Sequence, residues 1–141
     1  MTRKEFLAMT GKALAAAGAF GLAGGARTPP RSLRFESRNV DLHLKHAWTI
    51  ARNTSTAKRN VLTRISCDGV EGFGEAAPNV RYNEDWETVT TALDLLRPHL
   101  GDDPRRSAAI LDRLDEILPG NHAAKAAIDI ALHDWVGRKD G

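Results

Sequence analysis

At the start of its main body, the chain alternates apolar and polar residues with a period of two. From residue 33 to residue 45, Val40, Leu42 and Leu44 fall on one side, and the residues between them are polar. Alternation over this length is typical of a strand with one buried face. A second run, residues 60–67, is rich in β-branched side chains and predicts another strand.

A third strand is predicted at residues 70–76, joined to the second by Asp68 and Gly69. Asp-Gly between two strand-like runs is a strong signal for a two-residue hairpin. The pattern thus predicts a three-stranded antiparallel meander. Gly72 and Gly74 are poor strand formers, so they indicate either a bulge or the close approach of another stretch of backbone.

After Pro78 the apolar residues recur at helical spacing, in three separate stripes. Pro98 ends the first predicted helix, and Pro119 with Gly120 ends the second. Asn121 can cap the start of the third and Gly137 its end, and the alanine-rich face of this helix allows close packing. Strands followed by helices give an α+β fold, a meander followed by a three-helix bundle. The stripes are Trp86, Val89, Leu93 and Leu96; Ile110, Leu111, Leu114, Ile117 and Leu118; and Ala124, Ala127 or Ile128, Ala131 and Trp135.

Residues 1–30 form a separate segment that precedes the predicted domain at 31–141. A short basic start is followed by a weakly apolar stretch from Ala8 to Ala26 that ends in small residues, which is the order of an export signal. The opening resembles a twin-arginine signal, although it has Arg3-Lys4 in place of two arginines. Lys12 interrupts the apolar stretch, so a membrane-spanning helix is not expected. The alternative is an extension with an accidental alanine bias on a cytoplasmic protein.

Charge and cysteine content exclude several classes of function. The chain has 20 Lys and Arg against 18 Asp and Glu, and the excess lies within the first 26 residues. A neutral body argues against nucleic-acid binding, which needs a clustered positive surface. Cys67 is the only cysteine, so there is no internal disulfide and no paired-cysteine metal or redox motif.

A small anionic ligand would find suitable groups in residues 46–58, which we expect to form a long loop between the first two strands. This segment combines Trp48 and Arg52 with four hydroxyl side chains. An arginine can hold a carboxylate through charge-assisted hydrogen bonds worth about 1.5–3 kcal/mol each. The alternative is a solvated hairpin loop with Trp48 buried in the core.

No complete catalytic or metal-binding constellation is visible elsewhere. Glu75 at a strand end is most simply an anchor for backbone, and the acidic residues of 112–116 form a solvated helix face. Asp129 and His133 are helix neighbours four residues apart, a common surface pair. His43 and His46 fall on opposite faces of a regular strand. We therefore expect no catalytic residue and no metal ligand in this chain.

Two longer motifs carry a family resemblance. Residues 72–78 (Gly-Phe-Gly-Glu-Ala-Ala-Pro) and 123–135, which include Ala-Leu-His-Asp, are similar to the N-terminal capping domain of the enolase superfamily, in its mandelate racemase and muconate-lactonising branch. Residues 45–52 and 74–82 look most like those of dipeptide epimerases of the L-Ala-D/L-Glu type. The resemblance covers residues 33–141. Where many relatives carry glycine this chain has Asn83, which tolerates the left-handed conformation nearly as well.

The resemblance implies a specificity domain whose two loops close over a barrel active site and select a small acidic dipeptide. By position, the loops are residues 46–56 and 78–83. Arg52 would then hold the substrate carboxylate, while Trp48, Ile50 and Tyr82 shape the pocket. In this family magnesium assists proton abstraction next to a carboxylate, and the metal ligands and the acid/base lysines lie on barrel strands. No barrel strand lies within the 141 residues, so Glu75 and Asp134 are expected to be structural.

Three functional hypotheses follow from this reasoning. The first is the capping part of a dipeptide epimerase, inactive alone; the second is the same part of a cycloisomerase or an acid-sugar dehydratase. The third is a stand-alone binding module. Without a barrel to cover the alanine face and the apolar side of the meander, the isolated chain is expected to be marginally stable, sticky or homo-oligomeric.

Overall fold

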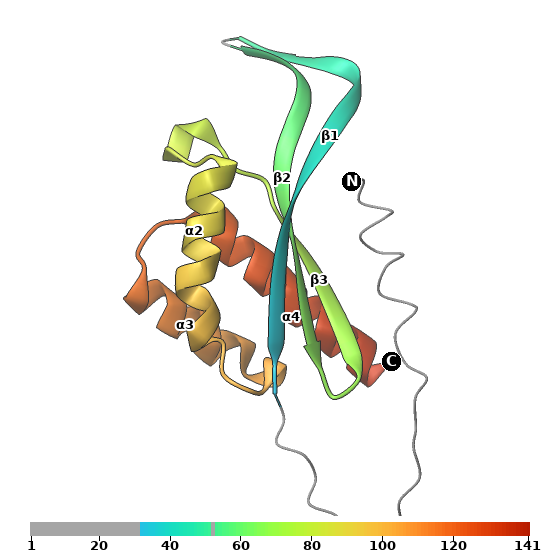
Figure 1. Ribbon diagram of the computed structural model, residues 1–141, viewed down its shortest axis with the longest axis vertical. Helices are drawn as coiled ribbons and strands as arrows, with labels where there is room; N and C mark the ends of the chain where they lie inside the picture. Colours follow the sequence, from blue (N-terminus) through green and yellow to red (C-terminus); the bar gives the residue numbers. More distant parts are fainter. Residues whose placement is uncertain (1–31, 52) are drawn as a thin grey trace, which may run out of the picture.

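The computed structural model describes residues 32–51 and 53–141, and it contains the predicted meander. Strands β1 (Arg34–Ile50), β2 (Asn53–Cys67) and β3 (Val70–Ala76) form one antiparallel sheet in the order β1-β2-β3 (Figure 1). The proposed leader, residues 1–30, and Arg52 lie outside the described residues.

Strands β1 and β2 are longer than predicted and project beyond the sheet as a two-stranded arm (Figure 1). The expectation of a long loop over residues 46–58 is therefore wrong, because Trp48 pairs with Ser55 in the ladder. Pairing shifts between His43 and Trp48, so that residues 44–47 lie opposite Thr56 alone, and the arm bends there. Both faces of the arm meet solvent, so no alternation of apolar and polar residues marks it in the sequence.

The β2–β3 connection is the predicted two-residue hairpin. Cys67 pairs with Val70, and both turn residues have positive φ, 50° for Asp68 and 74° for Gly69. This is the conformation of a type I′ turn, whose twist matches that of the flanking strands. The predicted third strand is therefore confirmed.

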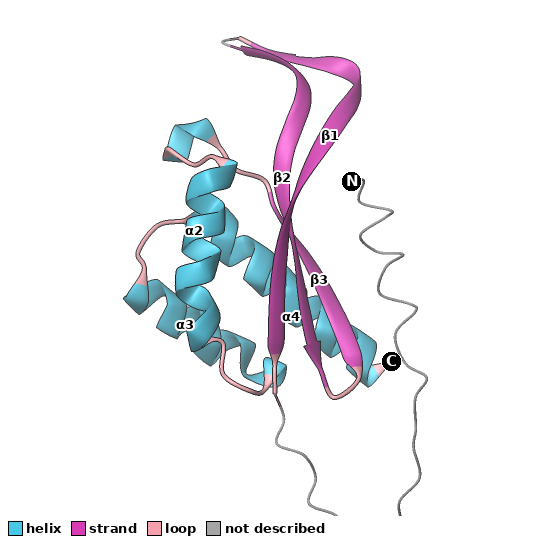
Figure 2. Ribbon diagram, viewed as in Figure 1, coloured by secondary structure: helices cyan, strands magenta, loops and turns pink. Residues whose placement is uncertain are grey.

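The helices follow the sheet in the predicted order (Figure 2). They are α2 (Trp86–Leu96), α3 (Ser107–Ile117) and α4 (His122–Asp140), with short 3-10 turns η2 (Val80–Tyr82), η3 (Arg97–His99) and η4 (Pro104–Arg106). The predicted helix end at Gly137 is wrong, because Gly137 lies inside α4, which continues to Asp140. Asn121 does occupy the predicted N-cap position of α4, but it has φ 50° and makes no capping hydrogen bond through its side chain. In the second stripe, Ile110 and Leu114 are buried while Ile117 is exposed.

Helix α4 packs directly on the sheet through its alanine face. A Cβ atom at Gly74 would lie 2.0 Å from the carbonyl oxygen of Ala127, and one at Gly72 would lie 2.2 Å from that of Ala131. The β2–β3 register is continuous across both glycines, so they mark a close approach of backbone and not a bulge. The expectation that this alanine face requires a barrel to cover it is wrong, because the sheet of the same domain covers it.

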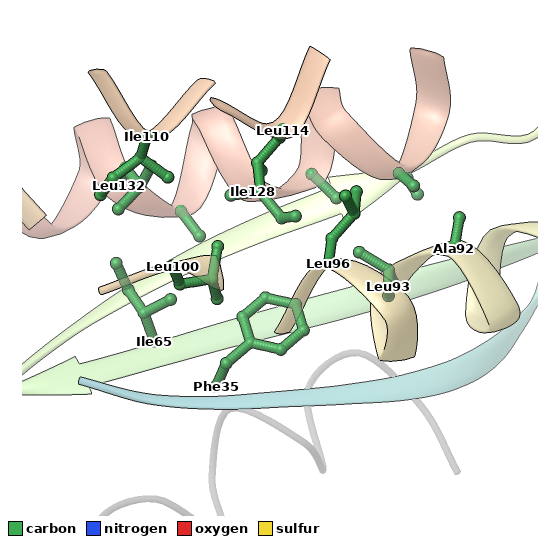
Figure 3. Packing of buried hydrophobic residues seen from close by; sticks show 14 of the residues in the cluster. Phe35, Ile65, Ala92, Leu93, Leu96, Leu100, Ile110, Leu114, Ile128 and Leu132 are labelled. Atoms are coloured by element: carbon green, nitrogen blue, oxygen red, sulfur yellow. The ribbon is translucent and has the colours of Figure 1, made fainter. Parts of the chain in front are cut away.

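The main core lies between the sheet and the helices. Phe35 and Ile65 of the sheet meet Leu100, which follows η3, and side chains of all three helices there. The helix side chains include Leu93, Leu96, Ile110, Leu114, Ile128 and Leu132 (Figure 3). Trp135 is 2% exposed, and its Nε1 donates to the carbonyl oxygens of Cys67 at 3.0 Å and Val70 at 3.1 Å. This side chain thus ties α4 to both sides of the β2–β3 turn.

The predicted apolar side of the first strand forms a second, smaller cluster. Val40 and Leu62 are buried, and Leu42 and Phe73 pack partly buried against them. Because strand side chains alternate between faces, this cluster lies on the face of the sheet opposite to Phe35. The expected half-buried strand is confirmed, but its even-numbered apolar residues point away from the helices.

Candidate functional site

The tip of the β1–β2 arm exposes two large apolar side chains. Trp48 is 63% exposed and Ile50 is 46% exposed, which contradicts the alternative that Trp48 is buried in the core. Across the arm, the hydroxyl oxygens of Thr49 and Thr54 lie 3.0 Å apart, and their residues are directly paired. The ladder thus holds the tip in an extended form that presents these side chains to solvent.

A second segment, residues 77–83, follows β3 and contains η2. Asn79 shapes it, since its side chain accepts from the backbone N–H of Arg81 at 3.0 Å and its carbonyl accepts from that of Tyr82 at 2.9 Å. Asn83 ends the turn with φ 55°, so asparagine does adopt the left-handed conformation here. Tyr82 is 62% exposed, and Val80, which sequence reasoning did not select, is 80% exposed.

The arm tip and the η2 segment lie at the same end of the molecule, which we call the apical end (Figure 1). Among the described residues, seven large hydrophobic side chains are exposed, and four of them, Trp48, Ile50, Val80 and Tyr82, are on these two segments. The other three are distributed over the helices. Exposed apolar area concentrated on two separate segments indicates a contact surface for a ligand or a partner.

Acidic side chains are absent from both apical segments. The sequence from residue 42 to residue 67 contains no Asp or Glu, and neither does that from 76 to 83, while Lys45, Arg52, Lys58 and Arg81 are basic. This composition favours an anionic ligand over a cationic one. Arg52 lies outside the described residues, so its predicted role stays a prediction.

The base of the arm is fixed to helix α2. Arg59 donates from Nε to Asp41 Oδ1 at 2.7 Å, and its guanidinium carbon lies 5.1 Å from the centre of the Trp86 ring at the start of α2. The hydrogen bond from Arg59 holds the pKa of Asp41 below its ordinary value. Thr90 of α2 adds a 3.2 Å hydrogen bond to Asn39 of β1. These contacts restrain the arm below its bend.

The acidic residues singled out in the sequence have local partners. Glu75 Oε1 accepts from Asn60 at 2.7 Å, and Asp134 Oδ2 accepts from the backbone N–H of Phe73 at 2.9 Å and from Arg138 at 2.8 Å. Asp129 faces His133 at 3.3 Å, as the surface-pair interpretation predicts. Glu75 and Asp134 thus make the kind of anchoring contact expected of structural carboxylates.

No metal centre is found in the part of the chain that the structure describes. Among residues 32–51 and 53–141, no three His, Cys, Asp or Glu side chains gather closely enough to hold a metal ion. These residues do not fit a magnesium site, and we assign no chemical step through magnesium to them. Over the same residues, none of the helices has the length and apolar character needed to cross a membrane.

Comparison with known proteins identifies the family. Residues 34–141 match the family "Mandelate racemase / muconate lactonizing enzyme, N-terminal domain". The match spans the whole sheet and all the helices described above, so the chain belongs to this family. The resemblance inferred from the motifs at 72–78 and 123–135 is confirmed.

The individual relatives are epimerases and related enzymes. It is 38% identical over 98 residues to an L-Ala-D/L-Glu epimerase of Bacteroides thetaiotaomicron, covering 70% of this chain and 26% of that protein. Two solved structures are similar. A dipeptide epimerase from Enterococcus faecalis complexed with Mg and L-Leu-L-Tyr has 29% identity and a TM-score of 0.71, covering 75% of this chain and 31% of that one. A muconate lactonizing enzyme from Pseudomonas fluorescens complexed with muconolactone has 32% identity and a TM-score of 0.73, covering 79% and 32%. The chain therefore spans about a third or less of the length of these relatives.

Proposed function

We propose that residues 31–141 are the substrate-capping, specificity-determining part of a dipeptide epimerase that acts on a small acidic dipeptide. The observation that carries the proposal is the apical end, where exposed Trp48, Ile50, Val80 and Tyr82 lie on two segments free of acidic residues. Such a surface suits a ligand that has both apolar atoms and a carboxylate. The similarity to an L-Ala-D/L-Glu epimerase supports this ligand class.

Each apical residue has a proposed role. Arg52 holds the side-chain carboxylate of the dipeptide through charge-assisted hydrogen bonds. Trp48, Ile50 and Tyr82 form apolar walls that exclude water from the bound ligand, and Val80 extends the same wall. These residues supply binding and orientation; proton abstraction next to the carboxylate, assisted by magnesium in the proposed enzyme, falls to a barrel that residues 31–141 do not include.

Residues 1–30 are proposed to be an export leader of the twin-arginine type, which would deliver the folded protein to the periplasm. The support is the order of basic, apolar and small residues in the sequence. Mass spectrometry of the chain recovered from periplasmic and cytoplasmic fractions tests it. The proposal requires a periplasmic form shortened by the leader; an intact chain found only in the cytoplasm would contradict it.

A cap graft tests the proposed function. Residues 33–141 replace the matching segment of the B. thetaiotaomicron epimerase, and exchange of the substrate α-proton in heavy water is followed by proton NMR. We expect the graft to exchange L-Ala-L-Glu. Arg52→Ala is expected to raise KM about 10- to 150-fold with little change in kcat, from the loss of about 1.5–3 kcal/mol. The matched control, Arg113→Ala, removes an exposed arginine on α3 and is expected to leave KM unchanged.

Two outcomes would contradict the proposal. If purified residues 1–141 alone catalyse magnesium-dependent exchange, the chain is more than a cap. If a folded graft treats L-Ala-L-Glu and L-Ala-L-Leu alike, and Arg52→Ala changes neither, the apical end does not select an acidic dipeptide.

Two other functions each have one supporting observation. Cycloisomerisation is supported by the structural match to a muconate lactonizing enzyme, and the graft would then favour unsaturated dicarboxylates over dipeptides in binding competition. A stand-alone binding module is supported by the self-contained core, since the sheet itself covers the alanine face of α4. It predicts binding of a small acid by residues 1–141 alone, lost in Arg52→Ala.

A further inference from the structure

Two consecutive carboxylates after the η2 segment bond to the starts of two different helices. Asp85 caps α2, since its Oδ1 accepts from the backbone N–H of Thr88 at 2.7 Å and its own N–H donates to Thr88 Oγ1 at 2.8 Å. The side chain of Glu84 bonds to α4 instead of α2. Its Oε1 accepts from the backbone N–H of Ala123, in the first turn of α4, at 3.1 Å.

Glu84 is one of the few buried charged residues among those described, with 6% of its surface exposed. The start of α4 needs a hydrogen-bond acceptor that Glu84 provides. Asn121, which precedes the helix, is in the left-handed conformation, makes no capping bond through its side chain and donates instead to the carbonyl of Pro119 at 3.3 Å. The first N–H groups of a helix need acceptors, and a carboxylate there also interacts favourably with the helix dipole. Glu84 supplies this acceptor from a segment 39 residues earlier in the chain.

The same residue closes the turn that carries Tyr82. The backbone N–H of Glu84 donates to the carbonyl of Asn79 at 3.3 Å, the acceptor already used by Tyr82. The Tyr82 ring meets the ring of His122, the first residue of α4, edge to face with centroids 5.5 Å apart. Glu84 and His122 therefore attach the η2 segment to the start of α4 at two neighbouring points.

We propose that Glu84 is a positioning residue that holds Tyr82 in a fixed orientation at the apical end by bonding the η2 segment to α4. Tyr82 is 62% exposed, so few of its own contacts restrain it. Its ring orientation depends on where the backbone of the segment lies relative to His122, and the bond between Glu84 and Ala123 sets that distance. The proposal rests on the proposed function only in giving Tyr82 a substrate to contact.

The chain contains a single tyrosine, which makes the proposal directly measurable. Biosynthetic labelling with fluorotyrosine gives residues 1–141 one fluorine resonance, which reports on Tyr82 alone. Glu84→Ala removes the acceptor and Glu84→Gln keeps an oxygen that accepts from Ala123. Glu87→Ala, the matched control, removes an exposed glutamate from the first turn of α2. His122→Ala removes the ring contact and leaves the bond between Glu84 and Ala123 in place.

Spectra are recorded well below the unfolding temperature of either variant. We expect the fluorine chemical shift of Glu84→Ala to change to the value found in His122→Ala. Glu84→Gln and Glu87→Ala are expected to match the unsubstituted protein. Hydrogen exchange at the Ala123 amide is expected to accelerate about tenfold in Glu84→Ala, from the loss of a capping bond, and not in His122→Ala. In the graft, Glu84→Ala is expected to raise KM for the dipeptide several-fold, with Glu84→Gln restoring it.

Other outcomes overturn the proposal. A folded Glu84→Ala variant with an unmoved fluorine resonance would make Glu84 a structural cap only. If Glu84→Ala does not fold, an unshifted resonance in His122→Ala would show that Tyr82 does not rest against α4 and would overturn the idea equally. An inactive graft with the expected fluorine shifts would count against the proposed function and leave the positioning role standing.

Discussion

Because α4 packs closely on the sheet, we predict that Gly74→Ala strongly destabilises the fold. The new Cβ would lie 2.0 Å from the carbonyl oxygen of Ala127 and 2.7 Å from Thr63 Oγ1. A carbon–oxygen contact needs about 3.3 Å, so α4 and β3 must move apart by about 1.3 Å. That movement also strains the 3.0 Å hydrogen bond that Thr63 Oγ1 donates to Ala127 O in the buried interface.

The expected loss is large for a single methyl group. Overpacking of a core costs about 1–3 kcal/mol, and loss of a buried hydrogen bond adds about 1 kcal/mol. We therefore expect the free energy of unfolding to fall by about 2–4 kcal/mol, which lowers Tm by about 8–16 °C for a domain of this size. Urea denaturation followed by tryptophan fluorescence and far-ultraviolet circular dichroism measures it.

Gly137→Ala is a control that is expected to raise the free energy of unfolding instead of lowering it. Gly137 lies inside α4, and a Cβ atom added there would meet no neighbouring atom within 4 Å. Alanine is therefore expected to stabilise the helix by about 0.5–1 kcal/mol. A Gly74→Ala variant within about 1 kcal/mol of the unsubstituted protein would refute the close approach. A destabilised Gly137→Ala variant would show that the helix ends at Gly137 after all.

Three further predictions concern single residues. Trp135→Phe is expected to cost about 1–3 kcal/mol in urea denaturation, because the carbonyl of Cys67 loses a buried donor; a change below about 0.5 kcal/mol would contradict this. Trp48→Ser is expected to change the free energy of unfolding by less than about 0.5 kcal/mol, because the side chain is 63% exposed; a large loss would mean that Trp48 packs in the core. Hydrogen bonds from the backbone and side chain of Thr88 hold the pKa of Asp85 below its ordinary value. Ionised Asp85 therefore favours folding above the unfolded-state pKa of about 3.9, and this contribution is lost as the pH falls through the lowered folded-state value. Asp85→Asn is expected to weaken the pH dependence of Tm in that acid range, and an unchanged profile would contradict it.

Sequence patterns predicted the elements in which one face is buried. The Asp68-Gly69 turn, the strand after it and the helix ended by Pro98 follow local rules that the fold does not override. Gly72 and Gly74 also gave a correct structural signal, since their lack of a side chain indicates a close neighbour. What the local pattern did not contain was the identity of that neighbour, which lies more than 50 residues later in α4.

The failures occur where the local sequence carries no signal of the structure. The ends of the arm have no buried face, so their pairing leaves no periodic pattern, and residues 46–58 were expected to be a loop. Asn121 occupies the N-cap position, but Glu84, from another part of the chain, supplies the side-chain acceptor to α4. Gly137 looks like a C-cap, yet the helix continues past it to Asp140. No local signal carries either fact.

The residues of the candidate site were predicted from the resemblance of the sequence to a family. The structure adds how exposed their side chains are. Trp48, Ile50 and Tyr82 lie on two segments at one end of the molecule, while their role toward a substrate stays a prediction. Val80 was missed because a single valine in a turn carries no pattern; its 80% exposure is the signal that identifies it. Glu84 was missed because its partner is 39 residues away.

The location of unpartnered apolar surface changes how the function should be tested. Sequence reasoning expected the alanine face of α4 to be exposed, but Gly72 and Gly74 bring that face against the sheet. The domain thus has a closed core of its own, which a residue range such as 33–141 can carry into a graft. The remaining exposed apolar side chains are concentrated at the apical end, so association of the chain with itself, if it occurs, should depend on Trp48 and Tyr82 more than on α4. Loss of self-association in Trp48→Ser, and its persistence in Ile130→Ser, would locate the self-association surface at the apical end and not on α4.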